Sequence, residues 1–99
     1  MEQGSQISSS IQSLTKDKEI RYTDEELIIR FQNGDEQAYV ELVNRYRNRL
    51  MTFVCGYVFD IDKAEDLVQD TFVKLYTKKD SYKPIAKFST WIYTIAGNL

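Results

Sequence analysis

The chain has 99 residues, which is enough for one domain with a modest hydrophobic core. Its 42% hydrophobic and 28% charged residues are ordinary for a soluble globular domain, and its net charge of -2 excludes attraction of nucleic acid by overall charge. With no histidine and one cysteine, the chain cannot form a histidine-dependent triad, an intramolecular disulfide, or the common zinc and di-iron sites.

The N-terminal segment, residues 1–22, is rich in serine and glutamine and has few apolar residues, so we expect a flexible leader. It lacks the apolar core of a signal peptide, and the longest mostly apolar run, residues 50–59, is too short to span a membrane. Cys55 lies in that run, which predicts a small buried core residue. We therefore expect a cytoplasmic protein without membrane insertion, whose folded domain covers residues 23–99.

Helical signals begin at Thr23 and continue through two predicted helices. Thr23 and Glu26 have capping-box spacing, and Asn33-Gly34 is a typical helix end. Asp35 is then expected to cap a second, long helix. Apolar residues at helical steps form the predicted core faces of the two helices: Leu27, Ile28 and Phe31 in the first, and Tyr39, Leu42, Val43, Tyr46, Leu50, Phe53, Val54 and Tyr57 in the second.

The third helix is expected to begin at Asp62, which has capping-box spacing to Glu65, and to end at Thr77. Its predicted core face consists of Ala64, Leu67, Val68, Phe72, Leu75 and Tyr76. A polar loop over residues 78–87 precedes a fourth helix that starts near Ser89 and runs past Ile95. The fold class predicted from these elements is all-α, a compact bundle of three or four helices.

Catalysis has no support in the residue pattern. The carboxylates at residues 24–26 and 65–66 lie at helix starts, where acids ordinarily stabilise the helix dipole. The sequence also lacks a glycine-rich phosphate loop. We expect no enzyme, and therefore no catalytic residue, no metal site and no cofactor.

The residue pattern instead predicts surfaces that bind other molecules. The outer face of the third helix gathers Glu65, Asp66, Gln69 and Asp70 beside an exposed Val73, which suits a protein partner, although a merely solvated acidic face is the alternative. The arginines of the segment NRYRNR, residues 44–49, are expected to form a solvated face, with a phosphate or acidic partner as the alternative.

The polar loop and the fourth helix interleave lysines with aromatic residues, a composition that suits single-stranded nucleic acid. Of the aromatic residues, Trp91 is expected in the core, whereas Tyr82, in a polar loop, is expected to be accessible.

The motifs AEDLVQDTFVKLY, residues 64–76, and FSTWIYTIAGN, residues 88–98, closely resemble region 2 of bacterial sigma factors of the extracytoplasmic-function (ECF) group of the sigma-70 family. The resemblance covers about residues 23–99. It implies a transcription initiation subunit that binds the clamp helices of the largest RNA polymerase subunit and captures the minus-ten promoter element as single-stranded DNA. It also implies an anti-sigma factor as a further partner.

The resemblance assigns residues to both partners. The polymerase-binding residues are Glu65, Asp66, Gln69, Asp70, Phe72, Val73 and Tyr76. The residues that hold the non-template strand are Tyr82, Lys83, Lys87, Phe88, Ser89 and Asn98. Within this second set, Tyr82 and Asn98 would form a pocket for a flipped base, and the lysines and Ser89 would hold phosphates.

Two departures from the family accompany this resemblance. Thr94 and Ile95 occupy about the places of the paired tryptophans that help primary sigma factors melt DNA, which is usual for the ECF group. The chain also stops just after Asn98, so we expect a fragment of a longer protein. The rival hypothesis is a helical protein-interaction module with an acidic face and no DNA role, and an accessible Tyr82 among lysines argues against it.

Overall fold

The computed structural model describes residues 21–99, so almost all of the predicted leader lies outside the described residues. Within this range the chain forms α2 (Asp24–Gln32), α3 (Glu36–Cys55), α4 (Ile61–Thr77), a short 3-10 helix η1 (Lys79–Ser81) and α5 (Phe88–Gly97). No strand occurs in residues 21–99, and the predicted all-α class is confirmed. None of the helices in this part of the chain has the length and apolar character needed to cross a membrane.

The helix ends follow local sequence signals. The Thr23 side chain accepts a hydrogen bond from the Glu26 N–H and the Glu26 side chain accepts one from the Thr23 N–H, which confirms the predicted capping box. Gly34 adopts a φ of 102°, a conformation that glycine reaches without steric cost, and it allows the sharp turn between α2 and α3. Asp35 caps α3 as predicted.

The start of α4 differs from the prediction. Asp60, not Asp62, is its N-cap, and the Asp60 side chain accepts hydrogen bonds from the N–H groups of Asp62 and Lys63. The helix therefore begins at Ile61, within the acidic corner that was expected to precede it. Several acids stand close together there, and capping-box spacing alone could not choose among them.

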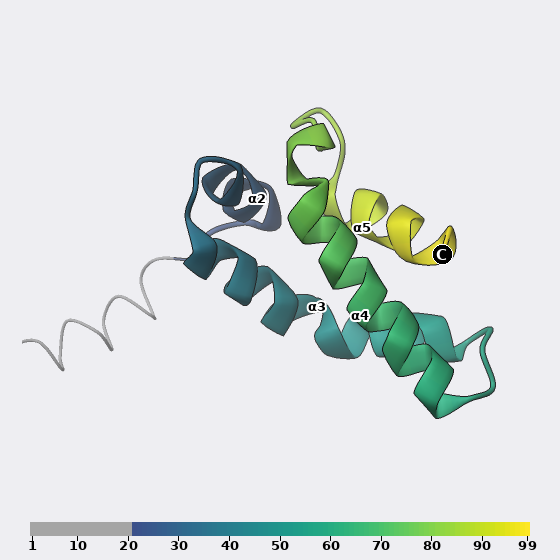
Figure 1. The fold of residues 1–99 in the computed structure, drawn as a ribbon. Coiled ribbons are helices and arrows are strands. Elements are labelled where there is room, and N and C mark those ends of the chain that lie inside the picture. Colours follow the sequence, from purple (N-terminus) through teal and green to yellow (C-terminus); the bar gives the residue numbers. More distant parts are fainter. Residues whose placement is uncertain (1–20) are drawn as a thin grey trace, which may run out of the picture.

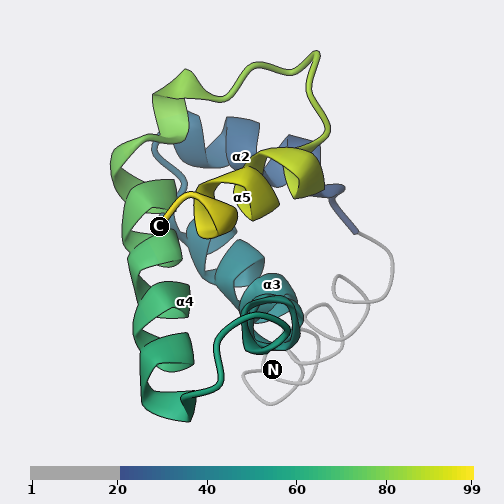
Figure 2. The same cartoon turned by 90° about the vertical axis from the view of Figure 1, so that its right-hand side faces the viewer.

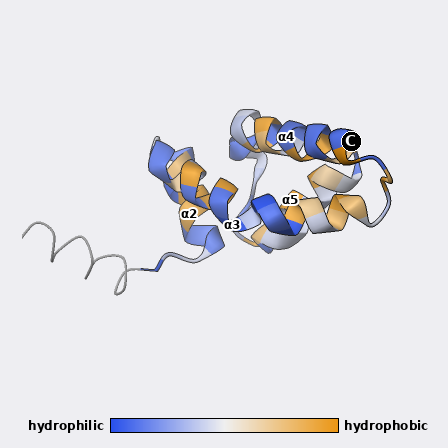
Figure 3. Cartoon of the chain, turned by 90° about the horizontal axis from the view of Figure 1, so that it is seen from below, coloured by the Kyte–Doolittle hydropathy of each residue, from blue (hydrophilic) through white to orange (hydrophobic). Residues whose placement is uncertain are grey.

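The helices pack around one core. In Figure 1, α4 crosses in front of the C-terminal half of α3 and α5 lies beside α4, while α2 packs near the start of α3. The view in Figure 2 shows α5 and α2 stacked above α3, with α4 along one side. Along α4, hydrophilic and hydrophobic residues alternate with the turns of the helix (Figure 3). The buried core residues of α4 are Ala64, Val68, Thr71, Phe72 and Leu75.

The C-terminal end of α3 is more exposed than predicted. Cys55 is exposed, because it ends α3 on the side away from the buried stripe of Leu50 and Val54. Phe53 and Tyr57 are also exposed, with ring centroids 5.7 Å apart, so they cover the edge of the core instead of filling it. The prediction of buried side chains is therefore wrong for these three residues.

The core face of α4 also differs from its prediction in detail. Tyr76 is exposed, and Leu67 is only half-buried, whereas Thr71 is fully buried. Thr71 tolerates burial because its hydroxyl donates a hydrogen bond to the Leu67 carbonyl, 2.7 Å away. The buried stripe thus includes one polar residue that the apolar pattern did not indicate.

Candidate functional site

The outer side of α4 carries a continuous row of exposed side chains, which we call the α4 face. Val73 is 58% exposed in the middle of this row, and the residues around it carry acids, an amide and a phenol. The face consists of Glu65, Asp66, Gln69, Asp70, Val73 and Tyr76, all of them exposed. It presents hydrogen-bond acceptors and negative charge around a small apolar centre.

Tyr76 is fixed at the end of this face. Its hydroxyl donates a hydrogen bond to Glu36 Oε2 over 3.0 Å, and its ring meets the Tyr39 ring edge-on, with centroids 5.0 Å apart. The hydrogen bond to Glu36 raises the pKa of Tyr76 above its usual value, so the phenol stays neutral. The Lys79 Nζ lies 4.5 Å from the centroid of Phe31 and links η1 to the same aromatic cluster.

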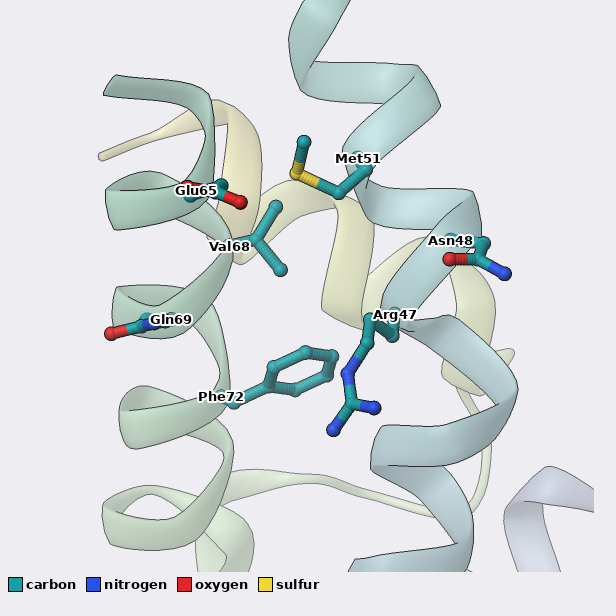
Figure 4. Close-up of a pocket in the computed structure, with 7 residues that line it drawn as sticks. All are labelled: Arg47, Asn48, Met51, Glu65, Val68, Gln69 and Phe72. Carbon is teal, nitrogen blue, oxygen red and sulfur yellow. The ribbon is translucent and has the colours of Figure 1, made fainter. Parts of the chain in front are cut away.

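A pocket of about 430 Å³ adjoins the α4 face in the groove between α3 and α4. Figure 4 shows Arg47, Asn48 and Met51 on one wall and Glu65 and Gln69 on the other. Val68 and Phe72 lie between the two walls. The pocket thus combines an apolar floor with a cation, two amides and a carboxylate at its rim.

Phe72 was predicted both as a core residue of the third helix and as a polymerase-binding residue, and its position confirms the first prediction. Its side chain is only 8% exposed and belongs to the core, and it reaches the surface only as part of the pocket lining. The pocket residues of α3 were not predicted as site residues at all. The only signal in the sequence was the arginine run that includes Arg47, which was assigned to a solvated face.

The arginines of α3 have three different environments. Arg45 donates from Nη1 to Asp24 Oδ1 over 2.9 Å and from Nε to Glu41 Oε2 over 3.1 Å, so it belongs to an internal ion-pair network. Burial lowers the pKa of Arg45, but the hydrogen bonds to these two carboxylates outweigh that effect and raise the pKa above its usual value. Arg49 lies over the Tyr46 ring at 5.1 Å. The predicted solvated face is therefore wrong for Arg45, whereas Arg47 and Arg49 are exposed as expected.

The second surface is built on residues 82–87, which we call the lysine loop. The Ala86 N–H donates to the Lys83 carbonyl over 3.0 Å and closes a tight turn, and the Tyr82 hydroxyl donates to the Ala86 carbonyl. From α2, Gln32 Nε2 donates to the Tyr82 carbonyl over 3.1 Å. These contacts hold the backbone of the loop while Lys83 and Lys87 remain exposed.

The aromatic residues of this surface lie inside it, which corrects two predictions. Tyr82 is only 2% exposed, and its ring packs against Phe88 and Trp91 with centroids 6.0 and 5.4 Å away. Phe88 is fully buried. Neither ring can contact DNA without leaving the core, so the predicted accessible Tyr82 is wrong. Trp91 is half-buried against the core, as expected.

Burial also sets the chemistry of the Tyr82 hydroxyl. Burial first, and then the charges of Glu25 and Asp24, raise the pKa of Tyr82 above its usual value, which keeps the phenol protonated as a donor. A loop has no helical period, so the sequence could not indicate which of its side chains point inward.

The remaining predicted residues lie along α5. Ser89 is half-buried in the first turn, and Asn98 follows the last turn with an exposed side chain. The Phe88 N–H donates to Glu25 Oε2 of α2 over 2.8 Å, a contact that the sequence did not predict. In residues 21–99, no cluster of three histidine, cysteine, aspartate or glutamate side chains is arranged to hold a metal ion.

Comparisons of the sequence and of the structure with known proteins indicate the same family. The family model of Sigma-70 region 2 matches residues 42–99. The ECF RNA polymerase sigma-E factor of Escherichia coli (strain K12) is 41% identical over 76 residues, which cover 77% of this chain and 39% of that protein. The RNA polymerase sigma-H factor of Pseudomonas aeruginosa is 33% identical over 75 residues, covering 76% of this chain and 39% of that protein.

A solved structure supports the same likeness. It is the NMR structure of an engineered region 2 of sigmaE in complex with GTAAAA, with a TM-score of 0.71 and 42% identity. The match covers 78% of this chain and 80% of that chain. By contrast, this chain spans only 39% of the length of the two curated relatives.

Proposed function

The chain belongs to the Sigma-70 region 2 family, with ECF-type relatives, and from this premise we propose that it joins RNA polymerase to the minus-ten promoter element. Proteins of this family are transcription initiation factors, not enzymes, as the sequence predicted. In this proposal the α4 face and the neighbouring pocket bind the clamp helices of the largest polymerase subunit. The lysine loop and α5 hold the non-template strand as single-stranded DNA.

Charge supports the polymerase contact. Three carboxylates of the α4 face, Glu65, Asp66 and Asp70, lie in the turns that precede Val73, and the six residues of the face include no lysine or arginine. A partner helix with basic side chains and an apolar ridge would pair with these carboxylates and cover Val73 and the pocket floor. Because the carboxylates lie on one helix, their backbone spacing is fixed before a partner binds, and this surface needs no rearrangement.

Position and charge support the DNA contact. Lys83 is exposed at the start of one hydrogen-bonded turn and Lys87 is exposed directly after it, so the turn presents two cations to solvent close together in the chain. Such an arrangement suits successive phosphates of a single strand. Asn98 adds an exposed amide that can pair with a base edge. The observation that carries the proposal is the placement of these lysines in a fold whose structural neighbour was solved with GTAAAA.

The rival function is a helical interaction module without a DNA role. Tyr82 no longer separates the two hypotheses, because its ring is buried. The distinction now depends on the exposed lysines and on the likeness to a DNA-bound region 2. The anti-sigma factor implied by the resemblance stays a prediction.

Two binding assays test the proposal. The full chain should co-purify with core RNA polymerase, and it should bind a single-stranded oligonucleotide that contains GTAAAA in an NMR titration. The complementary strand serves as the control for sequence preference. Binding to polymerase without any binding to DNA would favour the rival function, whereas binding to neither partner would overturn both parts of the proposal.

A further inference from the structure

The first N–H group of α5 donates its hydrogen bond to a distant part of the chain. Within the described residues, the Lys87 side chain at the N-cap position caps no N–H of the helix. The Phe88 N–H instead donates to Glu25 Oε2 over 2.8 Å, from a residue that lies 63 positions earlier in α2. A carboxylate in this place also stabilises the positive end of the helix dipole.

The residue next to Glu25 fixes the same turn of α2 to α3. Asp24 accepts hydrogen bonds from Arg45 Nη1, 2.9 Å away, and from the Tyr46 hydroxyl. The Tyr46 ring in turn packs edge-on against Phe88, with centroids 5.4 Å apart. The first turn of α2 is therefore held at two points, so the Glu25 carboxylate has a defined position beneath the start of α5.

We propose that Glu25 is a positioning residue that holds the lysine loop and the first turn of α5 in the geometry that binds DNA. The proposal rests on the function proposed above. Lys87 directly precedes Phe88, so the hydrogen bond from Phe88 to Glu25 fixes the end of the loop that carries this lysine. Gln32, also from α2, fixes the other end through the Tyr82 carbonyl.

The proposal assigns a role to residues outside the family match. The match to Sigma-70 region 2 begins at residue 42, whereas α2 spans Asp24–Gln32. The DNA surface would then be completed by a helix that precedes the matched segment. The proposal also places a negative charge at the α5 N-terminus, a position that would otherwise attract a DNA phosphate, so phosphates should be held by the lysine side chains instead.

Two substitutions separate the hydrogen bond from the charge. Glu25→Ala removes both, and loss of a helix cap of this kind should raise the exchange rate of the Phe88 amide hydrogen by about two- to thirtyfold. Glu25→Gln keeps an acceptor oxygen without the charge, so the exchange rate should stay close to that of the wild type. Asp62→Ala is the control, because it removes an exposed carboxylate from α4 and changes the net charge equally.

The same variants are titrated as full chains with the GTAAAA oligonucleotide. We expect Glu25→Ala to bind several-fold more weakly than Asp62→Ala, and Glu25→Gln to bind at least as tightly as the wild type. The inference is overturned if Glu25→Ala matches Asp62→Ala in both amide exchange and affinity, or if Glu25→Gln loses as much affinity as Glu25→Ala. Failure of the wild type to bind the oligonucleotide would overturn the proposed function itself, and amide exchange would still show whether Glu25 holds α5.

Discussion

The α4 face and the lysine loop differ in how their side chains are presented. On α4, all six residues of the face are exposed, and the buried residues follow one stripe on the opposite side of the helix. In the lysine loop, the large aromatic ring of Tyr82 points into the core, while Ile85, an aliphatic residue, is 97% exposed. In a helix, the 3.6-residue period decides which side chains point inward and which point outward. In a loop, this depends only on which side chains the neighbouring elements can bury.

This difference implies two kinds of interface. The α4 face is a preformed surface whose residues contact a partner directly. The lysine loop presents Lys83, Ile85 and Lys87 to solvent. Tyr82 packs against Phe88 and Trp91 of α5, and these rings support the turn from inside. Substitutions on the two surfaces should therefore have different consequences for stability and for binding.

The largest effect is expected at Phe88, which is fully buried and packs against Tyr82 of the lysine loop. Phe88→Ala should lower the free energy of unfolding by about 3–5 kcal/mol, because it leaves a large cavity in the core. Ile85→Ala, at the exposed tip of the same loop, should change it by no more than about 0.5 kcal/mol. Equal thermal melting temperatures for the two variants would show that the aromatic residues do not support the loop.

On the α4 face, substitutions should weaken binding and leave stability unchanged. Asp66→Ala combined with Gln69→Ala should weaken binding to core polymerase by about 2–5 kcal/mol if the carboxylate forms a buried charge pair there. Helix content and melting temperature should stay unchanged, because both side chains are exposed. Gln37→Ala with Asn44→Ala, two exposed amides on α3, is the control in the co-purification assay. Unchanged affinity of the α4 double variant would remove this face from the interface.

Tyr82 offers a smaller test of the internal support. Tyr82→Phe removes the hydrogen bond to the Ala86 carbonyl and should cost about 1 kcal/mol at neutral pH. Its effect on DNA binding should be modest and independent of base identity, because the ring does not stack on a base. A changed base preference in the oligonucleotide titration would show that Tyr82 contacts a base.

The phenols of Tyr82 and Tyr46 predict a loss of stability at alkaline pH. Burial is the main cause that raises the pKa of Tyr82 and of Tyr46 above 10.0. In the unfolded chain a phenol loses its proton near pH 10, whereas these folded phenols keep theirs to higher pH. The free energy of unfolding should therefore be unaffected below about pH 10 and fall as the pH rises through the folded pKa values.

Urea unfolding at about pH 8 and about pH 11 measures this effect. The combined variant Tyr46→Phe and Tyr82→Phe should show a shallower fall than the wild type between these two pH values. Identical falls would mean that other groups dominate the alkaline transition.

The smallest expected effect concerns the charge of the lysine loop. Lys83→Ala should leave the fold intact and weaken DNA binding evenly across sequences, because a phosphate contact carries no base information. The logarithmic salt dependence of binding should become flatter by about 0.7, the slope that one neutralised phosphate of a single strand contributes. The control is Lys63→Ala, which removes an exposed lysine near the start of α4. An equal change in slope for Lys83→Ala and Lys63→Ala would show that the loop has no specific phosphate site.

Much of the fold could be predicted because its signals are local. The Thr23 capping box, the turn at Gly34 and the Asp35 cap each depend on a few adjacent residues. Most of the exposed residues of the α4 face follow from helical spacing alone. The family, by contrast, came from matching two motifs, and no physical pattern in the sequence would have supplied it.

The missed features depend on contacts between distant parts of the chain. The hydrogen bond from Phe88 to Glu25 joins α5 to α2, and the pocket beside Arg47 exists only where α3 and α4 pack together. The burial of Tyr82 likewise depends on Phe88 and Trp91, which lie later in the chain. The acids of α2 were assigned to the dipole of their own helix, and only the structure shows that they also hold α3 and α5.

The central claim is that the chain holds polymerase and promoter DNA on two separate surfaces, and a crossed binding experiment tests it most directly. The double variants Asp66→Ala with Gln69→Ala and Lys83→Ala with Lys87→Ala are each measured against core polymerase and against the GTAAAA oligonucleotide. We predict that the α4 variant loses affinity for polymerase only and that the lysine variant loses affinity for DNA only. Loss of both affinities in either variant, with its melting temperature unchanged, would contradict the account.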